Sequence, residues 1–130
     1  MIDEILNVAK GLWSIKKSLS KAKGERREKL AKYFEQISNC LEEAAKVLRT
    51  GAIPHGKCGE MRGYAEMFTK TVKGIISEQE TEKFAKQLDA ARDIEYAVYE
   101  MEKRDRDSQL GKLEEASGLF QALANSIRVG

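Results

Sequence analysis

The side chains best suited to chemistry, a histidine and a cysteine, occur together in the segment 51–59. His55 and Cys58 are separated by two residues, as half of a metal site or a Cys–His nucleophile pair could be. A structural zinc ion needs about four ligands, whereas the chain has one histidine and two cysteines. Nothing else in the sequence resembles an orienting partner or an oxyanion hole for Cys58. We therefore expect neither a metal site nor a catalytic site, and predict that the protein is not an enzyme.

Carboxylates are frequent, but they do not form the motifs of catalytic helical bundles. A di-iron bundle needs two inward-facing glutamates that are each followed, three residues later, by a histidine, and this chain has a single histidine. Glycine-rich phosphate loops, nucleophile elbows and kinase motifs do not occur in it. We expect no cofactor and no small-molecule substrate.

The basic residues near the N-terminus are the stronger candidates for a binding site. Nine of them lie in the segment 10–32, which contains only Glu25 and Glu28 as acidic residues. These candidate anion-binding residues are Lys10, Lys16, Lys17, Lys21, Lys23, Arg26, Arg27, Lys29 and Lys32. They could contact the phosphates of a membrane or a nucleic acid, or they could form a solubilising face. Aromatic residues are not interleaved with the charges, which disfavours nucleic acid.

Two aromatic residues are candidate partner contacts. Trp13 lies on a wide apolar helix face flanked by lysines, as in interfacial helices; a bundle helix buried on two sides would show the same face, and both interpretations stay open. Tyr96 points about 160° away from the apolar face of its predicted helix, as expected from steps of about 100° per residue. An exposed tyrosine on a charged helix is typical of a protein contact.

Composition predicts one all-α domain that holds these residues. The chain has 130 residues, of which 42% are hydrophobic and only 7% are aromatic, and helix-forming residues dominate over β-branched ones. No apolar run approaches the roughly 20 residues that span a bilayer. Asp3 and Glu4 stand where a secretory leader would be basic. With two cysteines and no export signal, we expect a reduced, cytoplasmic protein.

Hydrophobic periodicity predicts an antiparallel, up-and-down bundle of four or five helices. The expected helices span about residues 3–23, 25–49, 60–76, 78–104 and 109–128. Gly51 should cap the second helix in a left-handed conformation, and the pattern from Ser77 to Glu80 predicts a capping box. The segment 51–59 should be a loop because it contains Pro54 and three glycines.

A short helical bundle with an amphipathic, basic N-terminal region is similar to the helical signalling modules that precede effector domains in immune and cell-death proteins. The likeness concerns shape and charge, and it implies binding or membrane action without catalysis. Our leading hypothesis is a non-enzymatic module for protein–protein interaction or self-association. The alternative is a binder of anionic surfaces, lipid or nucleic acid, through the basic segment.

Overall fold

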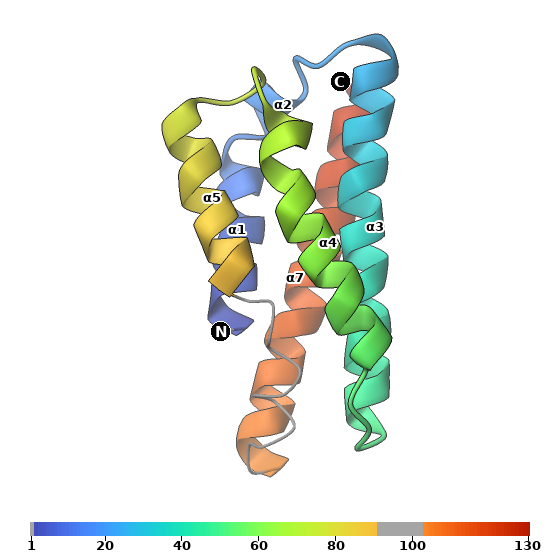
Figure 1. Ribbon diagram of the computed structural model, residues 1–130. Helices are drawn as coiled ribbons and strands as arrows, with labels where there is room; N and C mark the ends of the chain where they lie inside the picture. The colour runs from blue at the N-terminus through green and yellow to red at the C-terminus, as the bar shows by residue number, and fades with distance from the viewer. Residues whose placement is uncertain (1, 91–102) are drawn as a thin grey trace.

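The chain folds into an all-α helical bundle (Figure 1). The computed structural model describes residues 2–90 and 103–130. Their helices are α1 (Ile2–Ser14), α2 (Lys16–Leu19), α3 (Gly24–Arg49), α4 (His55–Val72), α5 (Glu78–Ala90) and α7 (Lys103–Val129). The predicted fold class is confirmed.

Five of the helices close into a ring. Helix α7 packs against α3 and α1, α4 packs against α3 and α5, and α5 packs against α1. Figure 1 shows that α1, α4 and α7 run in one direction and that α3 and α5 run in the other. Because a ring with an odd number of members cannot alternate throughout, one neighbouring pair must be parallel, and that pair is α1 and α7.

The core lies inside this ring and includes α1. Phe34, Phe68 and Phe120 come from α3, α4 and α7 and are fully buried, and the rings of Phe34 and Phe120 stack with centroids 6.0 Å apart. Ile2, Ile5, Leu6, Val8, Ala9 and Leu12 bury the apolar face of α1. The wide apolar face of this helix is therefore a core face.

Several local predictions are confirmed. Gly51 has a φ of 87°, and its N–H donates to the carbonyl of Leu48 at the end of α3. At the start of α5 the N–H of Glu80 donates to the hydroxyl of Ser77 over 3.1 Å, as a capping box requires. In the described ranges, no helix is long and apolar enough to cross a membrane.

The first predicted helix is wrong in its length, because the chain turns at Ile15. Helix α1 ends at Ser14, whose hydroxyl donates to the carbonyl of Gly11, and Ile15 has a φ of −109° and a ψ of 21°. The short helix α2 follows and brings Leu19 into the core with no exposed surface. The turn at Ile15 therefore precedes a second short helix whose apolar residue joins the core.

The predicted loop is also too long. Helix α4 begins at His55 rather than near residue 60, and the N–H of Cys58 already donates to the carbonyl of Pro54 over 3.0 Å. Proline is well tolerated where a helix begins, because its missing N–H would have no helical partner there. The same helix ends at Val72 and not near residue 76, because Gly74 adopts a φ of 79°.

Helix α7 starts earlier than predicted. The expected junction at residues 105–108 lies inside α7, which is continuous from Lys103 to Val129. The predicted helix 78–104 corresponds to α5 as far as Ala90; its continuation from residue 91 to 102 lies outside the described residues. Phe84 and Leu88 are buried on its predicted core face.

We predict that Gly11→Ala destabilises the protein. A Cβ atom added at Gly11 would lie 2.6 Å from the ring of Phe84, where α1 and α5 are in contact. Overpacking of this kind costs roughly 1–3 kcal/mol, whereas alanine gains at most about 1 kcal/mol of helix propensity. Urea denaturation followed by circular dichroism measures the change. Gly111→Ala is the matched control, since a Cβ there meets nothing within 4 Å and should stabilise α7. A Gly11→Ala protein as stable as the control would contradict the close contact.

Candidate functional site

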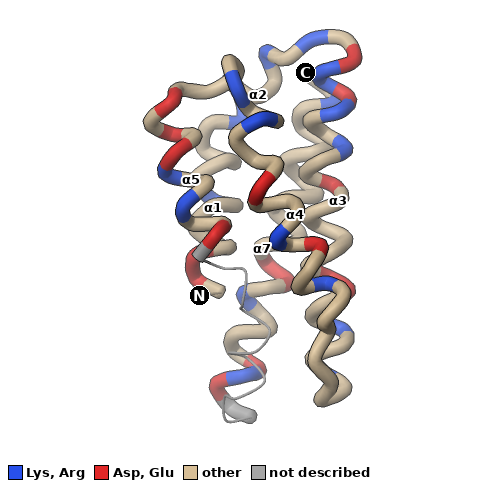
Figure 2. The backbone as a smooth tube through the Cα atoms, viewed as in Figure 1, with Lys and Arg blue, Asp and Glu red and all other residues tan. Residues whose placement is uncertain are grey.

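A groove between α3 and α4 brings together residues that are far apart in the sequence. It has a volume of about 450 Å³ and lies between the N-terminal half of α3 and the C-terminal half of α4. The lining residues are Arg26, Lys29, Leu30, Lys32, Tyr33, Gln36, Met67, Lys70 and Thr71. Four of these nine are basic and none is acidic. Figure 2 shows that these parts of α3 and α4 lie at the upper end of the bundle, where basic residues are frequent. We call this feature the α3–α4 groove.

Two carboxylates at this end of α3 are bonded to α7 and do not line the groove. Glu28 and Glu35 are seven residues apart, which is about two helical turns, and therefore share a flank. Arg128 of α7 bonds to both of them, with its Nε 3.1 Å from a carboxylate oxygen of Glu28. The bond to Glu35 is the main cause that raises the pKa of Arg128. Helix α7 thus binds these two carboxylates, whereas Lys29 and Lys32 line the groove beside α4.

Three lysines on the groove have no anionic partner among the described residues. Lys29, Lys32 and Lys70 are exposed and line a space without a carboxylate. Arg26 differs, because its guanidinium donates to the carbonyl of Lys73 at the end of α4. The lysines therefore present the positive charge that an incoming group would meet.

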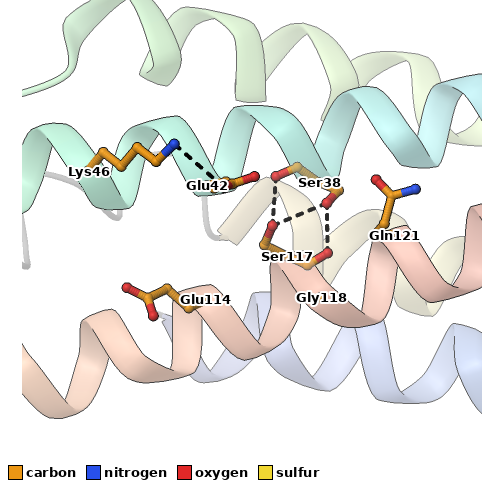
Figure 3. A pocket seen from close by; sticks show the side chains of 7 residues that line it. All are labelled: Ser38, Glu42, Lys46, Glu114, Ser117, Gly118 and Gln121. Carbon is orange, nitrogen blue, oxygen red and sulfur yellow. Dashed lines mark hydrogen bonds and ion pairs between the residues drawn. The ribbon is translucent and has the colours of Figure 1, made fainter.

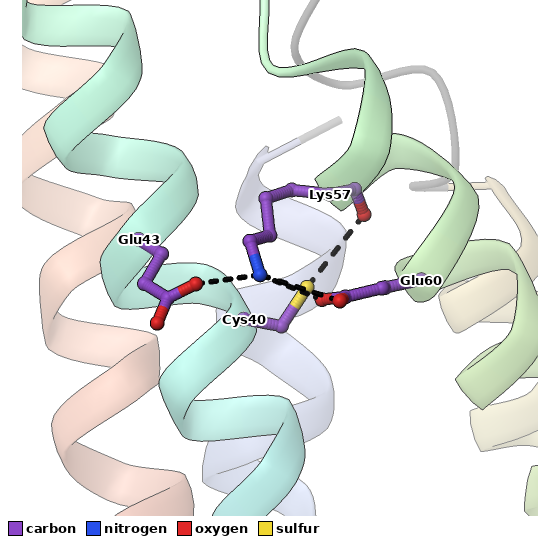
Figure 4. Close-up of polar contacts among 4 residues, drawn as sticks. All are labelled: Cys40, Glu43, Lys57 and Glu60. Atoms are coloured by element: carbon purple, nitrogen blue, oxygen red, sulfur yellow. Dashed lines mark hydrogen bonds and ion pairs between the residues drawn. The ribbon is translucent and has the colours of Figure 1, made fainter.

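At the opposite end of the same helix pair, a lysine is bonded to two carboxylates (Figure 4). Lys57 of α4 lies 2.5 Å from a carboxylate oxygen of Glu43 and 3.1 Å from one of Glu60. These bonds raise the pKa of Lys57, with Glu43 as the largest cause, and the same contact lowers the pKa of Glu43. The buried thiol of Cys40 donates to the carbonyl of Lys57 over 3.6 Å. The lysine is paired with carboxylates here, whereas the lysines of the groove are not.

Buried contacts beneath the groove fix its shape. Tyr33 is 4% exposed, and its hydroxyl donates to the carbonyl of Tyr64 over 2.5 Å. Burial is the largest cause that raises the pKa of Tyr33, so its phenol stays neutral and serves as a donor. The ring of Tyr33 also meets that of Tyr64 edge-on, with centroids 6.0 Å apart.

Three of the nine predicted basic residues line the groove, and six lie outside it. Arg26, Lys29 and Lys32 line the groove, whereas Arg27 donates to the carbonyls of Ser20 and Ala22 beyond the end of α2. The remaining residues outside the groove are Lys10 on α1, Lys16 and Lys17 on α2, and Lys21 and Lys23 before α3. All of these five are exposed except Lys16, which is half-buried.

The aromatic candidates and the His–Cys pair have separate surroundings. Trp13 is half-buried and packs against the core, with the Lys16 ammonium 4.4 Å from its ring centroid. Tyr96 lies outside the described residues. His55 is exposed at the start of α4, whereas Cys58 is buried. Across residues 2–90 and 103–130, no cluster of three or more His, Cys, Asp or Glu side chains could hold a metal ion.

A second hollow, between α3 and α7, is lined by charged residues that are paired within the chain (Figure 3). Its volume is about 490 Å³, and its lining includes Glu42, Lys46 and Glu114. At its base Ser38 and Ser117 each donate a hydroxyl hydrogen bond to the carbonyl of the other, over 2.7 and 2.8 Å. Glu42 and Lys46 pair with each other over 3.5 Å. Its polar groups are therefore satisfied within the chain.

Sequence analysis missed Met67 and Lys70. Met67 is 52% exposed, although most large apolar side chains in the described ranges are buried. The helical periodicity around Phe68 places both residues outside the apolar core face of α4. That position was the sign, in the sequence, that their side chains could be exposed. Their position beside Lys29 depends on which helices are neighbours, and a single sequence does not specify that.

Comparisons of this chain with protein-family models, with curated proteins and with solved structures found no match.

We predict that Lys57→Met makes stability less sensitive to acid. Because Lys57 lowers the pKa of Glu43 in the folded state, the carboxylate stabilises the protein above its unfolded pKa. That contribution is lost as the pH falls through the folded pKa. The loss of unfolding free energy between pH 6 and pH 3, measured by urea denaturation, should be smaller in Lys57→Met than in the wild type. Lys29→Met, which removes a lysine without a carboxylate partner, should lose as much as the wild type. Equal losses in all three proteins would refute the coupling.

Proposed function

We propose that this protein is a non-enzymatic interaction module that binds an anionic partner in the α3–α4 groove. The supporting observation is the set of three lysines, Lys29, Lys32 and Lys70, which surround a hollow that no acidic residue lines. Lys29 and Lys32 are one turn apart on α3, where like charges repel by roughly 0.2–0.5 kcal/mol. An anion bound between them relieves this repulsion.

Binding to a partner has more support than association of this chain with itself. Stable homodimers bury large apolar interfaces. Within the described ranges, Met67 and Val129 are the large hydrophobic residues with high exposure, and Val129 is at the end of α7. We also propose a cytoplasmic location, because two cysteines are too few for the disulfide framework of a small secreted domain.

Charge reversal tests the proposal. The variant Lys29→Glu/Lys32→Glu/Lys70→Glu should bind anionic probes about tenfold or more weakly, since each exposed charge contact is worth roughly 0.2–1 kcal/mol. The probes are poly-L-glutamate, phosphatidylserine vesicles and a single-stranded oligonucleotide. Binding is measured by fluorescence anisotropy or co-sedimentation, and it should weaken as salt rises above about 0.1 M, where the Debye length is about 10 Å.

The matched control is Lys10→Glu/Lys17→Glu/Lys21→Glu, which changes the net charge equally at exposed residues outside the groove. It should bind nearly as well as the wild-type protein. If both variants lose the same affinity, the attraction is diffuse and the groove is not the site. If the wild-type protein binds none of the three probes, the proposal is wrong.

A further inference from the structure

The geometry of the α3–α4 groove points to an occupant class, and this inference rests on the function proposed above. We propose that the groove takes an amphipathic helical segment of a protein partner, with a narrow apolar stripe bordered by aspartate or glutamate residues. The support is the combination of an apolar floor with cations on both sides of it.

The floor of the groove suits apolar side chains. Leu30 and Tyr33 are 1% and 4% exposed, so their small accessible surfaces lie at the bottom, and Met67 is 52% exposed beside them. A methionine side chain is flexible and polarizable and adapts to apolar groups of different shapes. Surfaces that accept helical segments of varied sequence use methionine in this way. Met67 is therefore the contact point for the apolar stripe.

The cations stand on two helices that flank this floor. Lys29 and Lys32 belong to α3, and Lys70 belongs to α4. Lys29 and Lys32 are three residues apart, which is about 4.5 Å along the axis of α3. On a bound helix, side chains at positions i and i+3 or i+4 are roughly 5–6 Å apart, which is a similar spacing. Carboxylates on both borders of a bound helix can thus meet lysines on both sides of the groove.

The size of the groove sets the extent of the contact. A volume of about 450 Å³ receives a few side chains and not the full width of a helix. The backbone of the partner therefore lies above the groove, with its apolar side chains inserted, as in other helix-in-groove complexes. So few inserted side chains give a weak, salt-sensitive complex.

A membrane or a nucleic acid fits these features less well. Membrane surfaces are bound by apolar side chains that project, whereas the apolar face of α1 is buried and Leu30 and Tyr33 lie at the bottom of a hollow. Single-stranded nucleic acid needs exposed aromatic rings for base stacking. The one aromatic side chain that lines the groove, Tyr33, is buried, and its hydroxyl is bonded to Tyr64.

Two peptides of identical composition test the inference. The first is an 18-residue helical peptide with leucines at i, i+3 and i+7 and glutamates on both borders, and the second has the same residues in scrambled order. By fluorescence anisotropy, the wild-type protein should bind the first peptide at least about tenfold more tightly than the second. Met67→Gln should reduce that preference at least about fivefold. Val129→Gln, at an exposed apolar residue outside the groove, is the matched control and should change nothing.

The outcomes separate this inference from the proposed function. Equal binding of the two peptides, or tighter groove-dependent binding of phosphatidylserine vesicles or the oligonucleotide, would overturn the helical occupant and leave an anion-binding groove. Absence of binding to every probe would overturn both. Preference for the amphipathic peptide that depends on Met67 and on the three lysines would support both.

Discussion

The packing of α3 between α7 and α4 is the constraint on which the rest of the bundle depends. Eleven residues of this helix are buried. Because it packs against two helices, its polar side chains lie beside these two contacts. Arg128 bonds to Glu28 and Glu35 on one flank, at the C-terminal end of α7. Surface ion pairs contribute little stability. Here the consequence is positional, because these two carboxylates are bonded to α7 while Lys29 and Lys32 line the groove.

The two ends of the α3–α4 contact differ in whether their lysines are bonded to carboxylates. At the end near Lys57, one cation lies between Glu43 and Glu60, and the two helices are joined by bonds within the chain. At the groove, the helices are joined by bonds to backbone carbonyls, from Arg26 to Lys73 and from Tyr33 to Tyr64. Lys29, Lys32 and Lys70 make no ion pair across this contact within the described residues.

The fold was largely predictable from the sequence, whereas the site was predictable only in part. The stripe of α3, from Leu30 to Leu48, was identified because burial on one face repeats every three or four residues. Helix ends were harder, since Pro54 and its glycines could start a helix as well as form a loop. The basic segment led to Lys29 and Lys32. Lys70 was missed because its place beside them is fixed by tertiary packing over about 40 residues of chain, which local patterns do not encode.

The same packing determines how the groove can bind. Its floor is held by Tyr33, whose ring and hydroxyl are fixed against Tyr64 within the bundle, so an occupant does not have to reorganise the core. The cost of binding then falls mainly on the lysine and methionine side chains, which lose rotamer freedom of roughly 0.5–1.5 kcal/mol each when they are immobilised. Charge contacts at exposed lysines are worth a similar amount. In the proposed complex, apolar contact at Met67 would add to this electrostatic attraction, which is why we propose a partner that combines acidic borders with an apolar stripe.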